Sequence, residues 1–182
     1  MGIHLKNNAV GLDKEINHLQ EWLYDRLLND FAWSDYECYG RAYLNKNPRV
    51  DGDKKNIFEV SVNGKDYAEI TMDDRHAGSS FFYKKKAGVT DGGLSSATVI
   101  LFFNLNLVKL LGQSNTRMDE NAIIDILNVL HINPSSFQIG DIKTGTKDVY
   151  SEYNINVQDR DNMSEYMVCS IEMTVNFIHQ YC

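Results

Sequence analysis

The sequence predicts an α+β domain in which a mainly antiparallel β-sheet carries two principal amphipathic helices on one face. Residues 12–27 and 123–130 repeat apolar side chains every three or four positions, as amphipathic helices do. Residues 167–177 alternate apolar and polar side chains, which is typical of a long strand with one buried face. Because few helical segments separate the patterned strands, we expect neighbouring strands to run antiparallel. No repeat or clear linker interrupts the chain, so residues 1–182 are expected to form one domain.

The opening helix is expected to begin near Leu12 and to end near Asn29. Its apolar stripe consists of Leu12, Ile16, Leu19, Leu23 and Leu27. Acidic residues near its start are stabilised by the helix dipole. Aromatic residues follow the helix, and residues 37–44 are predicted to form the first strand.

A hairpin is predicted after a polar loop at residues 45–56. Residues 58–62 alternate apolar and polar side chains, and residues 66–72 alternate again as the return strand. Between them, Asn63 and Gly64 tolerate the positive φ angles of a tight type I′ turn.

Residues 73–96 are expected to be a loop-rich insertion in the domain. Residues 80–85 form one short strand in this prediction, and three glycines between residues 87 and 96 favour a loop. Gly88, Gly92 and Gly93 do not fit a phosphate-binding loop, because no Lys-Ser or Lys-Thr pair and no helix start follows them.

The second strong strand pattern covers residues 99–107, in which every odd-numbered position is apolar. Ile100 and Phe102 are apolar as well, although they point to the opposite face, before two asparagines turn that face polar. We therefore expect the first half of this strand to be covered on both faces, by a helix or by a neighbouring subunit. Ile100 and Phe102 are the candidate subunit-interface residues.

The second helix is expected to be capped by Thr116 and to stop at Asn133-Pro134. A weaker segment follows at residues 137–142, and residues 150–157 alternate like a strand. The buried face of the last strand is predicted to carry Met167, Cys169, Ile171, Met173, Val175 and Phe177.

Composition limits the classes of function. A formal net charge of −7 argues against broad coating of nucleic acid, which needs a basic surface. The chain has no apolar run of about 18 residues and no apolar signal-peptide region at its start, so we expect no membrane partner. Three cysteines without paired spacing predict free thiols in a reducing compartment, with Cys38 and Cys169 packed on strands.

No pattern of residues predicts catalysis, a metal ion or a cofactor. Asp73, Asp74 and His76 lack a second ligand cluster, so a solvated turn explains them better than a metal site. Asp51 and Asp53 flank a glycine, but the run passes into lysines and lacks the closing glutamate of a calcium loop. The histidines are scattered, with no serine, cysteine or carboxylate at a spacing that implies a triad.

Lys84, Lys85 and Lys86 form the basic run of the chain. They are candidate contacts for nucleic-acid phosphates or for an acidic partner. Lysines at a strand end also discourage edge-to-edge pairing of sheets, and that explanation requires no ligand.

The order of elements resembles that of small bacteriophage neck and tail-completion proteins, the tail-terminator-like ring proteins. The segments that carry the resemblance are the opening helix with its aromatic exit (12–33), the strand 37–43, the block 97–107, the helix 118–130 and the closing strand 168–177. The resemblance covers most of the chain as a pattern of elements, without a sharp motif. The segment 73–96 has no counterpart in it.

The resemblance implies a structural virion protein, assembled in the host cytoplasm, that forms a ring at the junction of phage head and tail. Such a ring joins a portal or adaptor to the tail and allows DNA to pass. The partners would be copies of the chain in a cyclic homo-oligomer of six or twelve, together with neck, portal or tail proteins. A lumen that repels phosphate would let DNA slide through the ring.

Two other interpretations remain open. One is a non-catalytic binding module of a soluble bacterial protein, with a concave aromatic pocket on the exposed sheet face. The other is an enzyme that assembles Asp73, His76 or Cys38 in a cleft, which predicts a strongly perturbed titrating group there.

Overall fold

The computed structural model describes residues 2–47, 55–62, 66–70, 75–89, 94–112, 117–133, 137–153 and 165–178. The elements are β1 (Gly2–His4), α1 (Leu12–Phe31), β2 (Tyr36–Asn47), β3 (Lys55–Val62), β4 (Asp66–Glu69), β5 (Gly78–Val89), β6 (Leu94–Asn106), α2 (Leu107–Leu111), α3 (Met118–His131), β7 (Phe137–Thr144), α4 (Thr146–Val149) and β8 (Tyr166–Ile178). The predicted α+β class is confirmed, with α1 and α3 as the two principal helices.

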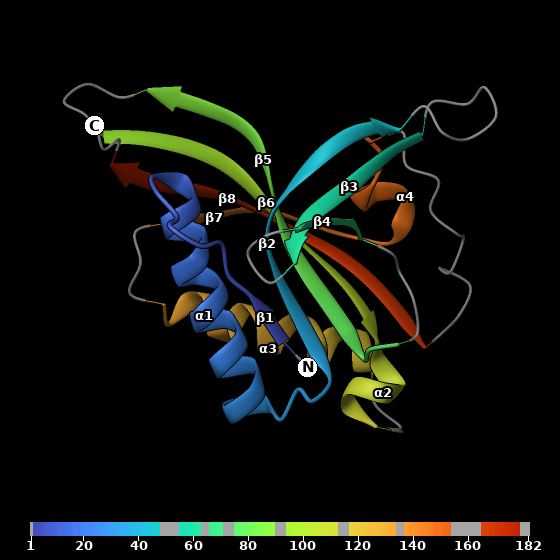
Figure 1. Cartoon of the computed structure of the whole chain (residues 1–182). Helices are drawn as coiled ribbons and strands as arrows, with labels where there is room; N and C mark the ends of the chain where they lie inside the picture. Colours follow the sequence, from blue (N-terminus) through green and yellow to red (C-terminus); the bar gives the residue numbers. More distant parts are fainter. Residues whose placement is uncertain are drawn as a thin grey trace.

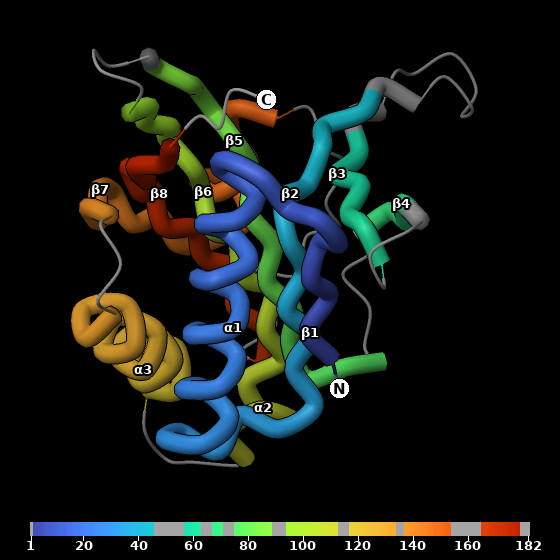
Figure 2. Tube along the Cα trace, turned by 60° about the vertical axis from the view of Figure 1, so that its left-hand side comes forward, coloured from blue at the N-terminus to red at the C-terminus, as the bar shows by residue number. Residues whose placement is uncertain are grey.

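One eight-stranded sheet forms the frame of the molecule, in the order β4-β3-β2-β5-β6-β8-β7, with β1 beside the first part of β2 (Figure 1). The pairs β1–β2 and β2–β5 are parallel, and the other pairs formed by the described residues are antiparallel. Consequently β4 and β7 lie at opposite edges of the sheet, with α3 on the β7 side (Figure 2).

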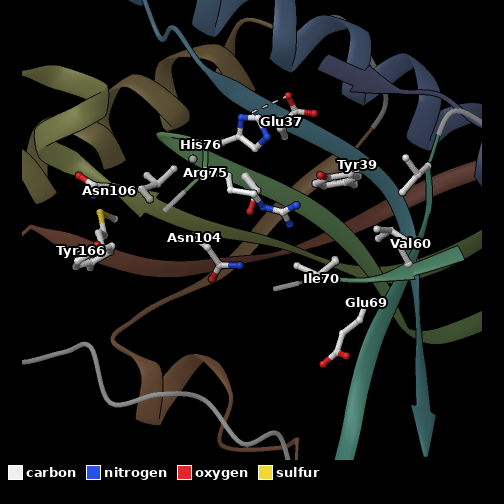
Figure 3. Close-up of a pocket in the computed structure, with 16 residues that line it drawn as sticks. Glu37, Tyr39, Val60, Glu69, Ile70, Arg75, His76, Asn104, Asn106 and Tyr166 are labelled. Carbon is white, nitrogen blue, oxygen red and sulfur yellow. Dashed lines mark ion pairs between the residues drawn. The ribbon is translucent and has the colours of Figure 1, made fainter. Parts of the chain in front are cut away.

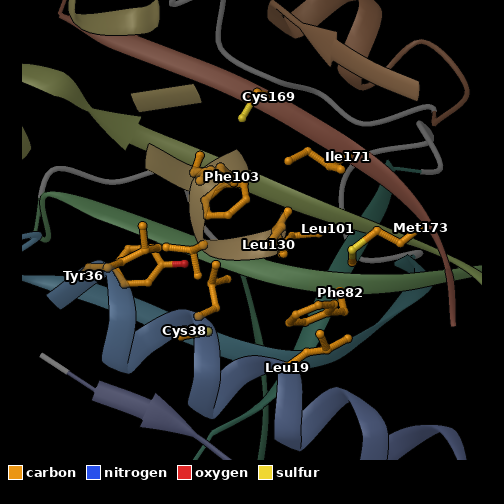
Figure 4. Close-up of a cluster of buried hydrophobic side chains, with 14 of the residues drawn as sticks. Leu19, Tyr36, Cys38, Phe82, Leu101, Phe103, Leu130, Cys169, Ile171 and Met173 are labelled. Atoms are coloured by element: carbon orange, nitrogen blue, oxygen red, sulfur yellow. The ribbon is translucent and has the colours of Figure 1, made fainter. Parts of the chain in front are cut away.

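Helices α1 and α3 cover one face of the sheet, which we call the helix face. Their apolar stripes pack on side chains of β5, β6 and β8, including Phe82, Phe103 and Met173 (Figure 4). Two indoles tie the helices together: Trp22 Nε1 donates to the carbonyl of Val129 at 3.0 Å, and Trp33 Nε1 donates to Asp125 Oδ2 at 3.1 Å. Both bonds cross from the opening segment to α3, so they fix how the two helices pack.

The last strand confirms the alternation predicted from the sequence. Its six odd-numbered side chains from Met167 to Phe177 are all buried against the helix face, none more than 7% exposed. On the other face, Val168 and Ser170 are buried as well, because α4 and the turn after it cover this end of the strand.

The predicted strand 99–107 and the predicted second helix are also confirmed, as β6 and α3. The predicted hairpin is β3–β4, in which Val62 pairs with Asp66. Its predicted turn at Asn63-Gly64 and the predicted cap Thr116 lie outside the described residues. The polar segment predicted as a loop is partly strand, since β2 continues to Asn47.

The predicted loop-rich insertion is wrong for most of its described part, although the short strand predicted at residues 80–85 is confirmed within β5. Residues 78–89 form β5, and residues 94–96 begin β6. The two strands pair from Gly78↔Leu105 to Val89↔Ser95, with one irregularity between Lys84 and Lys86. Backbone pairing with β6 stabilises the glycine- and lysine-rich part of β5 after residue 85, whose side-chain pattern does not indicate a strand.

The sheet face opposite α1 and α3, which we call the hairpin face, is covered by β3–β4 and by the segment around α4. Residues 150–153 were predicted to begin a strand, but they form a turn after α4. Tyr150 and Tyr153 from this turn join Phe58, Phe81 and Phe102 in an aromatic cluster. The alternation in this segment therefore reflects tyrosines that pack onto the sheet rather than a strand.

The prediction that Ile100 and Phe102 face another subunit is wrong. Phe102 is 0% exposed and Ile100 is 8% exposed within the single chain. The Phe102 ring stacks between Phe81 at 4.8 Å and Tyr150 at 5.5 Å, measured between ring centroids. The covering layer comes from this chain's own hairpin and α4 segment, so these two side chains are not available to a neighbour.

None of the helices in the described ranges combines the length and the apolar character needed to cross a lipid bilayer.

Candidate functional site

A pocket of about 260 Å³ opens on the hairpin face, between β3–β4 and the ends of β2, β5, β6 and β8 (Figure 3). It exists because β2 changes direction. The register of β2 against β5 shifts between Cys38 and Arg41, and such a bulge bends a strand and increases its twist. Beyond the bulge β2 pairs with β3, so the hairpin lies across the sheet face and forms the apolar wall of the pocket, with Val60, Val62, Ala68 and Ile70.

Glu37 forms part of the polar floor, and the residue is only 6% exposed. His4 Nε2 lies 2.6 Å from Glu37 Oε2, and the His4 ring stacks on Tyr39 with centroids 4.5 Å apart. The parallel pairing of β1 with β2 places His4 there. A Cβ at Gly2 would lie 3.0 Å from Glu37 Oε2, so the small residue leaves room for this buried carboxylate.

His76 links the floor to the rim of the pocket. Its Nδ1 lies 2.9 Å from Asp35 Oδ1 and 3.9 Å from Glu37 Oε1. The backbone N–H of Ala77 donates to Asp35 Oδ2 at 3.1 Å. The hydrogen bond from His76, supported by its charge and by the Ala77 N–H, lowers the pKa of Asp35 below its ordinary value.

Asn104 presents an amide to the pocket from the middle of the sheet. Its Oδ1 accepts a hydrogen bond from the Tyr150 hydroxyl at 2.9 Å, which fixes the orientation of the amide. Burial raises the pKa of Tyr150, so the phenol stays protonated and remains a donor. Asn104 is 7% exposed, and its Nδ2 has no hydrogen-bond partner within the described part of the chain. An unsatisfied buried donor costs about 1–3 kcal/mol.

Two charged residues stand at the rim. Arg75 extends into the middle of the pocket between His76 and Asn104, whereas Glu69 from β4 lies at the end beside Ile70 (Figure 3). The guanidinium of Arg75 and the amide of Asn104 both lie at the central part of the pocket.

The structure separates His76 from Cys38, which the sequence offered as possible partners in an enzyme. Cys38 points to the helix face, where Ser80 Oγ donates to its Sγ at 3.4 Å and the thiol donates to the carbonyl of Gln20 at 3.9 Å. Burial raises the pKa of Cys38 to about 12, so the thiol is protonated and unreactive near neutral pH. The same holds for Cys169, whose pKa burial also raises to about 12.

No group of three His, Cys, Asp or Glu side chains in the described ranges is arranged to hold a metal ion. Asp73 and Asp74, offered with His76 as metal ligands, lie outside those ranges, as do Asp51 and Asp53. Gly88 is paired with Ser96 in the β5–β6 ladder. It is therefore part of a strand rather than of a phosphate-binding loop.

The basic run does not form one patch. Lys84 pairs in register with Val99, whose side chain lies in the helix-face core, whereas Lys86 pairs with Thr98 on the opposite face. Lys85 Nζ lies 3.2 Å from Glu152 and 3.3 Å from Glu172, and these partners raise its pKa. Lys85 is thus engaged in ion pairs that join β5 to β8 and to the turn after α4.

Sequence reasoning did not locate this pocket or name the residues that line it. The one signal for it is the place where Asn104 and Asn106 interrupt an otherwise apolar strand. Both are only 7% exposed and both line the pocket. Glu37 and Arg75 gave no signal, because their meeting depends on the sheet order and on the bend of β2.

Comparison with known protein families finds no matching family, and comparison with curated proteins finds no matching sequence.

Proposed function

We propose that this chain is a structural subunit of a ring at a phage head–tail junction, of the neck, connector or tail-terminator kind. In that place it joins a portal or adaptor to the tail and allows DNA to pass. Two supports come together: the resemblance in element order, and a sheet that ends in two unlike edges. The second observation carries the proposal, because unlike edges are what head-to-tail assembly requires.

The first edge is β7, which pairs with β8 and is the last strand of the sheet. Most of its side chains are exposed, including Ile142 at 40%. The neighbouring helix α3 exposes Ile124 at 54%, and the residue that follows it, Ile132, is 56% exposed. Single exposed apolar residues are ordinary on protein surfaces, but three on one flank are typical of a surface used in association.

The second edge is β4, at the opposite end of the sheet. Its Tyr67 is 51% exposed and its ring lies 5.5 Å from that of Tyr43, which is 42% exposed. Exposed tyrosines couple apolar area to a polar tip, which suits an interface. In the proposed assembly, β7 and α3 of one copy contact the β4 edge of the next, and rotation closes the chain of contacts into a ring.

Of the three lysines expected to contact DNA or a partner, Lys85 is no longer a candidate. Lys84 and Lys86 are exposed and stay candidate contacts, whereas Lys85 is held by Glu152 and Glu172. The two free-standing positions lie on opposite faces, so we propose that one contacts a neighbour or the lumen and the other supports solubility of the strand end.

The pocket on the hairpin face favours a second candidate function. A non-catalytic binding module would use this pocket for a ligand and would need no ring. The two proposals differ in a measurable property, because the first requires self-association and the second does not.

The test is the oligomeric state of the purified chain, measured by native mass spectrometry and electron microscopy. We expect a cyclic oligomer for the natural chain. Ile142→Asp should reduce it to smaller species, because a carboxylate would have to be buried at the contact. Leu94→Asp is the matched control: Leu94 is 45% exposed but begins a central strand, and this variant should still form rings.

A chain that stays monomeric at the highest attainable concentration contradicts self-assembly and favours the binding module. Rings that survive Ile142→Asp but are lost in Leu94→Asp would show that the contact lies at the strand ends and not at the β7 edge.

A further inference from the structure

We infer that a second copy of this chain pairs with it through backbone hydrogen bonds, with β4 of one copy beside β7 of the next. This contact rests on the proposed ring function and gives it an atomic form, because it names the backbone groups that join two subunits. Its basis is the hydrogen-bond pattern at the two ends of the sheet.

Strand β4 turns backbone groups away from the sheet. The N–H of Ile70 donates to the carbonyl of Phe58 at 2.9 Å, so these opposite residues are a hydrogen-bonded pair. Hydrogen-bonded and non-hydrogen-bonded pairs alternate along an antiparallel ladder. Tyr67 and Glu69 are therefore in the other phase, and their N–H and C=O groups point away from β3. Within the described residues, no further backbone hydrogen bond satisfies these groups.

Strand β7 does the same at the opposite end of the sheet. The N–H of Gly145 donates to the carbonyl of Val168 at 2.9 Å, which makes these opposite residues a hydrogen-bonded pair. By the same alternation, Lys143 faces β8, whereas Ile142 and Thr144 point their N–H and C=O groups outward. Both outward residues are exposed, and no other backbone partner for them lies in the described ranges.

The two edges match in length. The register of β7 against β8 shifts between Ile139 and Ile142, and such a bulge bends a strand and interrupts regular pairing. The regular part of this edge therefore begins at Ile142, and β4 has only four residues. Each edge offers outward groups on residues i and i+2. Short or bulged edges resist indiscriminate pairing, so this ladder favours a partner of matching length.

The sheet topology gives the direction of the pairing. Strands β4, β2, β5 and β8 run one way, whereas β3, β6 and β7 run the other way. A copy placed by rotation about an axis along the strands keeps these directions, so its β4 meets the neighbouring β7 antiparallel. Hydrogen-bonded pairs then form between Tyr67 and Thr144 and between Glu69 and Ile142.

The same register is consistent with the faces of the sheet. It places Ala68 opposite Lys143 of the next copy. Ala68 lines the pocket on the hairpin face, and Lys143 lies opposite Ser170 on that face. The hairpin faces of neighbouring copies therefore lie on the same side. In a closed ring every β4 edge is covered by a β7 edge, so these outward groups are satisfied.

The first test separates backbone pairing from side-chain contact. Thr144→Pro and Glu69→Pro each remove an outward N–H, whereas Thr144→Ala and Glu69→Ala shorten the same side chains and keep it. Proline is tolerated on an edge strand where the N–H faces solvent, so the fold should survive, as thermal melting checks. Native mass spectrometry of the full chain over a dilution series measures ring formation. Each proline should raise the concentration of half-assembly roughly tenfold or more, and each alanine less than about threefold.

The second test fixes the register and decides the question if a proline variant does not fold. In a Cys182→Ser background, Ala68→Cys is combined with Lys143→Cys. These positions form a non-hydrogen-bonded pair in the proposed ladder, where the side chains are close enough for a disulfide. Oxidation should link successive copies, as seen on denaturing gels. The matched control combines Ala68→Cys with Gln138→Cys, an exposed position on the same face of β7 but before the bulge, and should link far less.

The outcomes distinguish this contact from the ring itself. Rings that persist in both folded proline variants overturn the strand pairing and leave the ring proposal intact. Equal loss of rings in the alanine variants overturns it as well, because side chains would then make the contact. Equal cross-linking of the two cysteine pairs overturns the proposed register and with it the pairing. A natural chain that stays monomeric contradicts the ring function, and the strand pairing falls with it.

Discussion

Replacement of Phe102 by alanine tests whether this side chain belongs to the internal core of the chain or to a contact between subunits. Phe102 is 0% exposed and its ring has four aromatic neighbours, with centroid distances of 4.8 Å to Phe81, 5.4 Å to Phe58, 5.5 Å to Tyr150 and 5.8 Å to Tyr153. Alanine leaves a cavity that these rings, anchored on separate elements, fill only in part. The loss should therefore appear in the stability of the isolated chain.

The magnitude follows from the burial. Truncation of a buried phenylalanine to alanine lowers the free energy of unfolding by about 3–5 kcal/mol. The stacked pairs with Phe81 and Tyr150 place Phe102 toward the upper end of that range, because such pairs contribute about 0.5–1.5 kcal/mol each beyond their buried area. For a chain of this length, the change corresponds to a melting temperature lower by about 6–20 °C.

The assay is urea unfolding followed by circular dichroism and tryptophan fluorescence, at two protein concentrations. The matched control is Val10→Ala, which removes an apolar side chain that is 64% exposed and should change the free energy of unfolding by less than about 0.5 kcal/mol. A Phe102→Ala variant that loses less than about 1 kcal/mol of stability but associates differently from the natural chain would refute the assignment of this side chain to the internal core.

Two further predictions concern titrating groups. In a Cys182→Ser variant, iodoacetamide at mildly alkaline pH should label Cys38 and Cys169 only after unfolding, because burial raises the pKa of each thiol to about 12. Labelling is measured by mass spectrometry, and rapid labelling of the folded chain would contradict this prediction. His76→Gln should raise the pKa of Asp35 toward its ordinary value, as followed by carbon NMR of the carboxyl group, because His76 is the main cause of the lowered pKa. Because the pKa of Asp35 is lower in the folded chain than in the unfolded chain, its ionised carboxylate stabilises the fold. This stabilisation is fully present above the unfolded-state pKa and is lost as the pH falls through the folded-state pKa. An Asp35 titration that is the same in both proteins would exclude this pairing.

The strongest periodicities in the sequence predicted the elements that form the frame. The helices α1 and α3 each bury one apolar stripe, and β6 and β8 each place an unbroken apolar row on the helix face. Such a row is visible in the order of residues even where the other face of the strand is covered as well. The β3–β4 hairpin was predicted for the same reason, because alternation on both sides of a turn is a local signal.

Other elements were mispredicted because their stability comes from partners that are distant in the sequence. The C-terminal part of β5 is rich in lysine and glycine, and it is a strand because β6 lies beside it. Tyr150 and Tyr153 alternate as strand residues would, yet they form a turn that packs onto Phe102. Ile100 and Phe102 were correctly predicted to be covered, but the sequence did not distinguish a covering layer within the chain from one in a neighbour.

By itself, the sequence determined the fold class, the two principal helices and the strand that crosses the centre of the sheet, because each of these is specified by side chains close together in the chain. Only the tertiary structure decided that Glu37, Arg75 and Asn104 surround one pocket. They lie on segments that meet through the order of the strands and the bend in β2, and no periodicity along one segment records which other segment will lie beside it.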